Sequence, residues 1–273
     1  MNTTMNKTTR SLDNLEYGLS LKKSNGRKLL VCYITGGLHK NWLDVLHVVA
    51  DAGADAIEIG IPFSDPVMDG PVIQEASMKA LEAGATPLSI LRQLAGIEAG
   101  IPLAVMTYYN LVYRMGEERF TEQLLQSGVT GAILPDLPLD EAGQWIEVSK
   151  KSDVSSVLLA APTTRDERLS EIAEKSRGFI YAVGLLGVTG ERDELSDSAT
   201  LLASRLKSRT EKPVLIGVGI SNPATAKKAC RAADGVVVGS ALVRRLLEEK
   251  DMTEIAAFVK SLRSALDDSD TAI

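Results

Sequence analysis

Short, nearly continuous apolar segments alternate with longer amphipathic segments along most of the chain. Each short segment is rich in Val, Ile and Leu, and most begin or end at Gly or Pro. Runs of this length and composition are typical of parallel strands that are buried on both faces. The predicted strands are residues 29–34, 55–60, 102–107, 130–135, 154–160, 178–183, 213–218 and 234–239.

The longer segments place apolar residues at helical spacing, and several of them end at Gly. They predict helices at residues 42–53, 87–97, 117–128, 140–151, 166–176, 198–208, 222–232 and 240–250, with further helices at 12–23 and 253–266. Eight strands alternating with eight helices over about 250 residues predict an α/β fold, a single (β/α)₈ TIM barrel with an extra N-terminal helix. A doubly wound open sheet has the same alternation and is the alternative.

The composition of the chain restricts its domain organisation and its possible functions. No linker or shift in composition divides the chain, so we expect one domain over residues 1–273, with the polar ends 1–9 and 267–273 frayed. The net charge of −6 and the aromatic content of 4% disfavour a general binder of nucleic acid or anionic membranes. The sequence shows neither a membrane-length apolar run nor a secretory signal, so a cytoplasmic location is expected.

A carboxylate lies inside the second predicted strand. Side chains alternate along a strand, so Ala56, Glu58 and Gly60 share one face and the intervening isoleucines share the other. The isoleucine face should pack on the helices, which turns Glu58 into the barrel. A buried carboxylate without a partner is costly, so we expect Glu58 to be paired, protonated or functional. Burial would raise its pKa toward neutrality and suit it to general acid/base catalysis.

The loop after this strand, PFSDPVMDGP, carries two more carboxylates, Asp65 and Asp69. Asp in a loop rich in Pro and Gly is commonly a turn former, because its side chain bonds the local backbone. Asp65, which precedes Pro66, fits that interpretation. For Asp69 the local sequence leaves a turn and a catalytic role equally open.

Glycine-bearing loops follow the last two predicted strands, and each meets the start of a helix. GVGISNP covers residues 217–223, and Gly239-Ser240 opens the helix at 240–250. In barrels this pair of loops forms a common phosphate site, where backbone N–H groups at helix N-termini bind the oxygens. Neither loop contains Lys or Arg, so amides and helix dipoles would bind the phosphate. Plain left-handed turns are the alternative.

Other features restrict the chemistry further. The loop at 184–197 is the longest after a strand and is a candidate lid or a plain surface loop. No Lys lies in a predicted strand, which disfavours a Schiff-base aldolase, and two histidines argue against a metal aldolase. The residues Cys32 and Cys230 suggest packing in a reducing compartment. Carbon–carbon chemistry here would depend on carboxylates.

The segment IEIGIPFSDPVMDGPVIQ (57–74) closely resembles the signature of the tryptophan synthase α subunit family. Further similarity lies in YITGG (33–37), TYYN (107–110), GAILPDLP (131–138), GVTG (187–190), GVGIS (217–221) and GVVVGSALV (235–243). The resemblance therefore spans nearly the whole chain in order. It implies a TIM barrel that cleaves indole-3-glycerol phosphate to indole and D-glyceraldehyde 3-phosphate, a retro-aldol reaction of tryptophan biosynthesis.

The resemblance also implies roles for residues. Glu58 would be the general acid/base, and Asp69 would accept a hydrogen bond from the indole N–H and stabilise the charge that develops there. The remaining substrate-binding residues implied by the resemblance are Tyr33, Tyr181, Thr189, Gly190, Gly219, Gly239 and Ser240. Among them, Gly190, Gly219, Gly239 and Ser240 would bind the phosphate, and Thr189 would meet Asp69 when the lid closes.

A β subunit is the partner that the resemblance implies, in an α2β2 tetramer. Pyridoxal phosphate would belong to that subunit, and no cofactor is expected in this chain. Docking would involve loops on the active-site face, including Pro62-Phe63 and Asn110. The chain departs from the family pattern at Cys32, at Leu38-His39 and at Gly184-Leu185-Leu186, which bears on lid closure and coupling to the partner.

Three other functions stay open at this stage. A free-standing lyase would release indole without a partner. Another phosphate-binding barrel, such as a sugar-phosphate isomerase, would need its own acid/base pair on other strands. An inactive barrel would act as a scaffold or activator of the β subunit.

Overall fold

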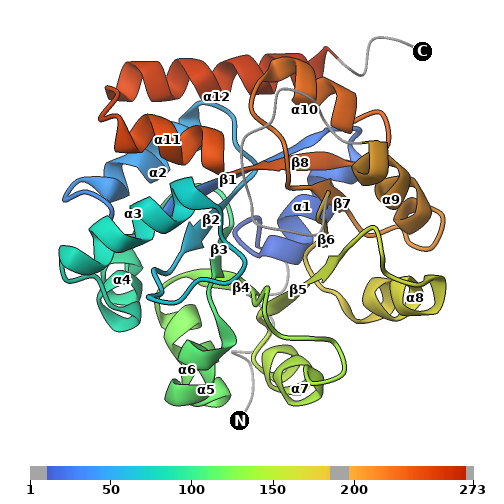
Figure 1. The fold of residues 1–273 in the computed structure, drawn as a ribbon, viewed down its shortest axis with the longest axis horizontal. Coiled ribbons are helices and arrows are strands. Elements are labelled where there is room, and N and C mark those ends of the chain that lie inside the picture. Colours follow the sequence, from blue (N-terminus) through green and yellow to red (C-terminus); the bar gives the residue numbers. More distant parts are fainter. Residues whose placement is uncertain (1–10, 185–196, 269–273) are drawn as a thin grey trace.

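Eight parallel strands close into a barrel in the computed structural model, which describes residues 11–184 and 197–268 (Figure 1). Each strand pairs with the next, and β8 pairs with β1, so the barrel is confirmed and the open sheet is excluded. The strands are β1 (Leu29–Thr35), β2 (Ala56–Gly60), β3 (Leu103–Met106), β4 (Val129–Ile133), β5 (Ser155–Ala160), β6 (Ile180–Ala182), β7 (Val214–Ile216) and β8 (Gly235–Val238).

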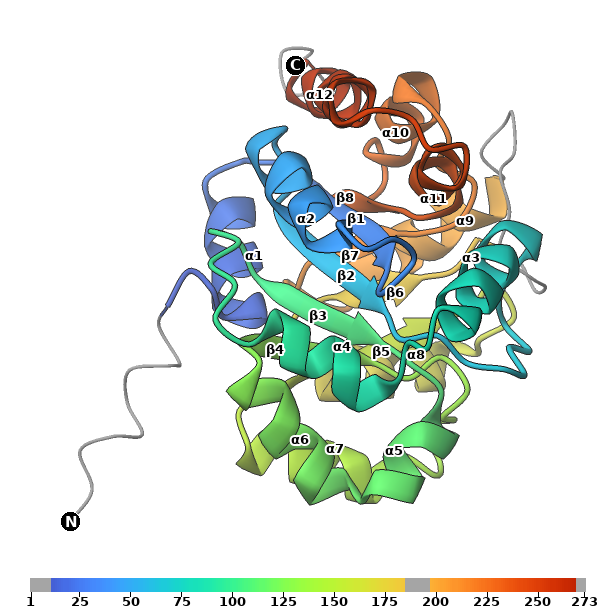
Figure 2. The same cartoon turned by 90° about the vertical axis from the view of Figure 1, so that its left-hand side faces the viewer.

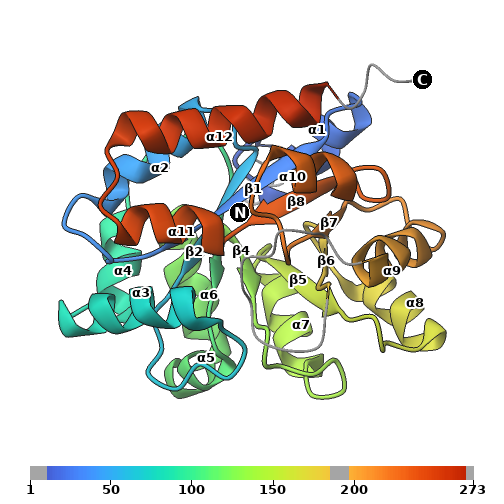
Figure 3. The same cartoon turned by 45° about the horizontal axis from the view of Figure 1, so that its top comes forward.

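Helices surround this barrel, and α12 lies across α2 and α10 on its outer surface (Figure 3). The helices are α1 (Leu15–Ser24), α2 (Trp42–Asp51), α3 (Pro71–Glu82), α4 (Pro87–Leu94), α5 (Tyr109–Met115), α6 (Glu117–Gln126), α7 (Gly143–Lys151), α8 (Asp166–Lys175), α9 (Asp197–Lys207), α10 (Pro223–Ala229), α11 (Ser240–Leu247) and α12 (Met252–Asp267). Every helix predicted from the pattern is present within a few residues of its expected bounds. Asp267, expected in a frayed end, lies in α12 and pairs with Arg263 at 2.7 Å.

Two helices, α3 and α5, were not predicted as such. The buried face of α3 includes Ala76, Ser77 and Ala80, which give a weak apolar stripe. The helix begins with Pro71 at its first position, where the fixed φ of proline suits a helix start. Within α5 the one buried residue is Val112, so the periodic signal is too short to recognise.

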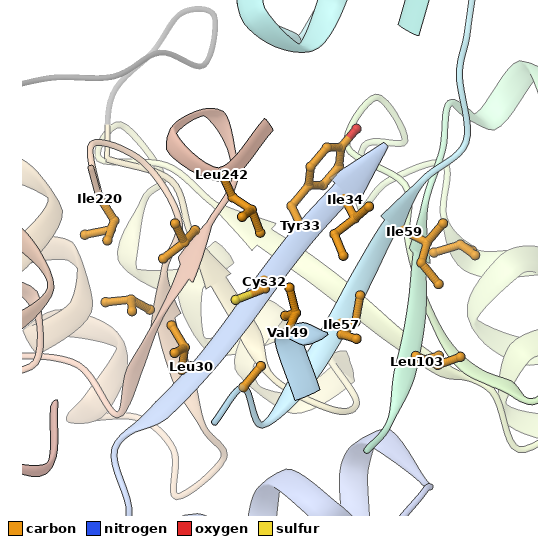
Figure 4. Packing of buried hydrophobic residues seen from close by; sticks show 14 of the residues in the cluster. Leu30, Cys32, Tyr33, Ile34, Val49, Ile57, Ile59, Leu103, Ile220 and Leu242 are labelled. Atoms are coloured by element: carbon orange, nitrogen blue, oxygen red, sulfur yellow. The ribbon is translucent and has the colours of Figure 1, made fainter. Parts of the chain in front are cut away.

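Alternation along the strands divides the core into an inner and an outer layer. Ala56 belongs to the cluster inside the barrel, whereas Ile57 and Ile59 pack in the cluster between the strands and the helices. Figure 4 shows the outer layer, where Cys32 and Ile57 lie beside Val49 of α2. The inward direction expected for Glu58 is therefore confirmed by its neighbours on β2.

The N-terminal helix α1 closes one end of the barrel (Figure 2). Leu15 and Leu19 are fully buried among the inward-facing strand residues. The Leu15 amide donates to the Thr130 hydroxyl at 3.0 Å, and that hydroxyl donates to the Asp13 carbonyl at 2.9 Å. The barrel thus has one end filled by α1, and the carboxyl ends of its strands lie at the other.

A second buried carboxylate, Asp55, shows how this fold satisfies a charge that has a structural role. Asp55 is fully buried directly before β2, and it accepts hydrogen bonds from the Leu30 amide at 2.9 Å and from Arg27 at 2.7 Å. Arg263 adds a contact at 3.1 Å. Glu58 lies three residues further along the chain, within β2, and has no such partners among residues 11–184 and 197–268.

Candidate active site

Glu58 is a buried carboxyl without a hydrogen-bond partner in the described part of the chain. Its side chain is 1% exposed, and neither Oε1 nor Oε2 has a partner among residues 11–184 and 197–268. Burial, with a smaller contribution from Asp69, raises the pKa of Glu58 to about 8. The group is therefore mostly protonated at neutral pH and holds a proton that it can exchange with a bound molecule.

Asp69 lies at the end of the loop after β2, directly before the residues that start α3. Burial raises its pKa to about 6, and the nearby Tyr108 hydroxyl acts in the opposite direction. Glu58 and Asp69 thus have separated pKa values, so that one is protonated and the other is ionised at pH 7. Separation of this kind assigns different roles to two neighbouring carboxyl groups.

Two tyrosines predicted to bind substrate, Tyr33 of β1 and Tyr181 of β6, line the same pocket. The two residues are 8% and 7% exposed. The Tyr33 ring lies over Gly60 of β2, and the Tyr181 ring lies over Gly217, which directly follows β7. A Cβ on Gly60 would overlap the Tyr33 ring, and a Cβ on Gly217 would overlap the Tyr181 ring. Burial and the nearby carboxylates raise the pKa of both phenols well above its ordinary value, so both stay neutral donors.

The rest of the pocket wall is predominantly apolar. It combines Ile73 of α3 with residues from the loops and strand ends around the barrel: Met68, Met106, Pro135, Leu159, Ala161, Val183 and Val218. An apolar wall of this kind suits a flat aromatic ring and lowers the local dielectric constant. The electrostatic effect of the two carboxyl groups is strengthened in such a site.

The other end of the pocket reaches the start of α11. Gly239 and Ser240 line it, and Gly239 is the N-cap of α11 without a side-chain cap among the described residues. The N-terminus of α10 differs, because the Asn222 side chain caps it by accepting from the Thr225 amide at 3.0 Å. Of the two predicted phosphate-binding helix starts, α11 is the one left open for an anion.

The remaining predicted residues have three different outcomes. Gly219, which has a φ of +79°, does not itself line the pocket among the described residues. Its neighbours Gly217 and Val218 do. Thr189 and Gly190, with most of the candidate lid at 184–197, lie outside the described residues. Asp65 is exposed and contacts Ser64 at 2.5 Å, as expected for a turn residue.

Sequence reasoning missed the importance of Tyr108, which it included only as part of the TYYN segment (107–110). Tyr108 is 5% exposed, its hydroxyl accepts from the Met68 amide at 3.0 Å, and the same hydroxyl lies close enough to Asp69 to lower the pKa of that carboxyl. Its ring stacks on Phe63 with 4.9 Å between centroids. No local sequence pattern predicts these contacts, because they join residues about forty positions apart.

Residues 11–184 and 197–268 contain no group of three or more His, Cys, Asp or Glu side chains that would hold a metal ion. The side chains of Cys32 and Cys230 are buried. Over the same ranges, the helices are too short or too polar to cross a membrane.

The fold and the pocket define a (β/α)₈ barrel with two carboxyl groups in an apolar pocket at the carboxyl ends of its strands. The family model described as "Tryptophan synthase alpha chain" matches residues 19–268. The chain belongs to the tryptophan synthase alpha chain family.

Individual relatives agree with this assignment. The tryptophan synthase alpha chain of Streptomyces coelicolor is 42% identical over 237 residues, which are 85% of this chain and 88% of the relative. The Arabidopsis thaliana alpha chain is 39% identical over 269 residues, 95% of this chain and 98% of the relative. Among solved structures, Mycobacterium tuberculosis tryptophan synthase gives a TM-score of 0.85 at 36% identity and covers 92% of this chain and 97% of its own.

Proposed function

We propose that Glu58 and Asp69 carry the reaction of this chain, the cleavage of indole-3-glycerol phosphate to indole and D-glyceraldehyde 3-phosphate. The activity is that of the tryptophan synthase alpha chain family, so the chain is a carbon–carbon lyase of tryptophan biosynthesis. One observation carries the assignment of the residues. Glu58 is a buried, unpartnered carboxyl among the described residues, and it shares a pocket with Asp69.

The reaction requires two proton movements. Indole C3 must gain a proton before its bond to the glycerol chain breaks, and the hydroxyl next to that bond must lose one. Protonated Glu58 gives its proton to C3 and becomes a carboxylate. The carboxylate then takes the hydroxyl proton as the carbon–carbon bond breaks, so the aldehyde forms, the bonding electrons restore the aromatic ring, and Glu58 ends protonated as it began.

Asp69 acts at the indole nitrogen. Protonation at C3 places positive charge on the indole nitrogen, and an ionised Asp69 accepts the N–H hydrogen bond and stabilises that charge. Its pKa of about 6 supports this role, because the group is mostly ionised at neutral pH. The apolar wall strengthens the attraction by excluding water.

The substrate phosphate is assigned to the open start of α11. Gly239 and Ser240 provide the uncapped helix N-terminus, and we include Gly219 and Gly190 as further backbone donors. Tyr33 and Tyr181 contact the part of the substrate between the phosphate and the ring. Thr189 is proposed to approach Asp69 when the loop that contains it closes.

The partner of the chain is a tryptophan synthase β subunit, which receives the indole. In the proposed α2β2 tetramer, pyridoxal phosphate belongs to the β subunit, and the proton transfers described above need no cofactor in this chain. We place the enzyme in the cytoplasm, where its two buried thiols, Cys32 and Cys230, would stay reduced. We also propose that residues 1–273 form one domain.

Indole release from indole-3-glycerol phosphate tests this function. The purified chain should release indole and glyceraldehyde 3-phosphate in equal amounts, and addition of the cognate β subunit should raise the rate. Release that the β subunit leaves unchanged would identify a free-standing lyase instead. An inactive chain that still stimulates the β subunit would identify a scaffold.

A further inference from the structure

The side chain of Tyr33 runs along one wall of the pocket, from the start of α11 to β2. A Cβ built on Gly239 would be 3.7 Å from the Tyr33 Cβ, so the base of the side chain lies at the helix start. The ring extends toward the carboxyl end of β1, with the hydroxyl oxygen at its tip (Figure 4). That hydroxyl fills the place that a side chain on Gly60 would need. The phenol therefore presents its oxygen at β2, away from the helix start assigned to the phosphate.

The pairing of β1 with β2 places this hydroxyl close to Glu58. Tyr33 and Glu58 are partners in the register of the two parallel strands, and both line the pocket. Glu58 and Gly60 are two positions apart, so they share the inner face of β2 with about 7 Å between them along the strand. The Tyr33 hydroxyl replaces the missing side chain at position 60, and the Glu58 carboxyl extends into the same space from the neighbouring inward position. One small polar group of a ligand can therefore contact both.

The Tyr33 phenol is a hydrogen-bond donor at neutral pH. Burial, with further contributions from Asp69 and Glu58, raises the pKa of the phenol well above its ordinary value, so it keeps its proton. The nearby Thr35 hydroxyl acts in the opposite direction; it is buried, faces Gly60 in the strand register and has no hydrogen-bond partner among the described residues. A phenol oxygen can accept a hydrogen bond from such a neighbour and still donate its own hydrogen to a ligand.

We propose that Tyr33 is a catalytic residue whose hydroxyl donates a hydrogen bond to the substrate hydroxyl from which Glu58 removes the proton. The proposal rests on the function proposed above and extends it, because it assigns the phenol to one oxygen atom of the substrate. That oxygen accepts from Tyr33 and has one hydrogen of its own to donate. The hydrogen is then directed at the Glu58 carboxylate, which is the base that must take it.

The step moves one proton and breaks one bond. Glu58 takes the hydrogen of the substrate hydroxyl, the bond to indole C3 breaks, and the oxygen becomes the carbonyl oxygen of the aldehyde. Tyr33 keeps its own proton throughout. Negative charge builds on the oxygen as its proton leaves, and the Tyr33 hydrogen bond stabilises that charge within a predominantly apolar wall. Because the hydrogen bond is stronger in the transition state than in the bound substrate, its loss should lower kcat more than it lowers affinity.

Substrate binding tests which oxygen Tyr33 contacts. Dissociation constants are measured in a Glu58→Gln background, where turnover is not expected, with and without Tyr33→Phe. The ligands are indole-3-glycerol phosphate, an analogue that lacks only the hydroxyl next to the indole ring, and an analogue that lacks only the other hydroxyl. We expect Tyr33→Phe to weaken the first and third by about three- to tenfold and to leave the second unchanged. Equal weakening of all three, no weakening, or the same selectivity from Tyr181→Phe instead would overturn the proposal.

Turnover tests the catalytic part of the proposal. With Glu58 in place and saturating cognate β subunit, kcat for indole release by Tyr33→Phe should fall about tenfold or more. Tyr17→Phe is the matched control, because it removes a hydroxyl from α1 at the closed end of the barrel. An unchanged kcat for Tyr33→Phe would overturn the proposal. The two proposals fail separately: a chain that does not bind indole-3-glycerol phosphate would refute the proposed function, whereas binding without selectivity for the hydroxyl would refute the role of Tyr33 alone.

Discussion

The hydroxyl group of Tyr33 occupies the position that a side chain on Gly60 would need. The two residues lie on neighbouring strands, β1 and β2, and a Cβ at position 60 would overlap the outer atoms of the tyrosine ring. The ring lies beside Gly239 at its other end, where a Cβ would be 3.7 Å from the Tyr33 Cβ. Gly60 therefore lets an aromatic side chain extend across the pocket from the start of α11 toward β2.

Gly60→Ala should lower the catalytic activity while the barrel still folds. The added methyl group forces the Tyr33 ring to move, at a cost of about 1–3 kcal/mol for overpacking. We expect kcat/KM for indole release to fall at least about tenfold, with a modest decrease in the free energy of unfolding measured in urea. Gly143→Ala is the control, because a Cβ there meets no atom within 4 Å.

The source of the loss can be identified with a second substitution. In a Tyr33→Val background the overlap is absent, so Gly60→Ala should cost less stability there than it costs in the wild type. An equal cost of Gly60→Ala in both backgrounds would mean that the strain arises elsewhere than between these two residues.

The pH dependence of kcat/KM should be bell-shaped. Asp69 must be ionised to stabilise the ring charge, so activity falls as the pH drops below its pKa of about 6. Glu58 must begin protonated, so activity falls as the pH rises above its pKa of about 8. Initial rates of indole release across this range measure both limbs, and a profile that keeps rising above pH 9 would contradict an initially protonated Glu58.

Glu58 should also make the protein less stable at high pH. Its pKa is about 8 in the folded chain against 4.5 for an unperturbed Glu, so folding favours the protonated form. The stability due to protonated Glu58 is complete below pH 4.5 and is lost as the pH rises through 8. Glu58→Gln cannot ionise there, so its free energy of unfolding should exceed that of the wild type at pH 9 by a few kcal/mol. Urea denaturation at pH 5 and pH 9 measures the difference, which should nearly vanish at the lower pH.

The helix α1 should contribute to stability without contributing to the chemistry. Leu19 is fully buried inside the barrel at the end away from the pocket, so Leu19→Ala leaves a cavity and should cost about 2–5 kcal/mol. Urea denaturation should show that loss, whereas the KM of the folded variant should stay near the wild-type value. Leu12→Ala, at a residue that is 55% exposed, should leave both unchanged.

The barrel was predictable because its strands are buried on both faces and therefore give strong apolar runs. Alternation within one such run was enough to direct Glu58 inward, and Ala56 confirms that direction. The helix α3 escaped prediction since Ala76 and Ser77 on its buried face interrupt the apolar stripe. A local hydrophobic pattern detects elements that bury large apolar side chains. It does not detect a helix whose buried face consists mostly of small residues.

The candidate site was harder to predict from the sequence than the barrel. The role of Asp69 came from the resemblance, because its local surroundings fit a turn equally well. Its contact with Tyr108 joins two βα units and has no sequence period that would reveal it. The capping of α10 by Asn222, which leaves α11 as the open helix start, likewise depends on side-chain geometry. The single domain over residues 1–273 stays a prediction.

Indole release by Glu58→Gln tests the central claim most directly, because glutamine keeps the shape of the side chain and removes its transferable proton. The rate should be measured with saturating β subunit beside the wild type and Asp69→Asn, with substrate binding followed separately. We expect Glu58→Gln to bind substrate and release no measurable indole, and Asp69→Asn to lose most but not all of its rate. Near-normal release by Glu58→Gln would contradict the claim that this carboxyl carries the proton.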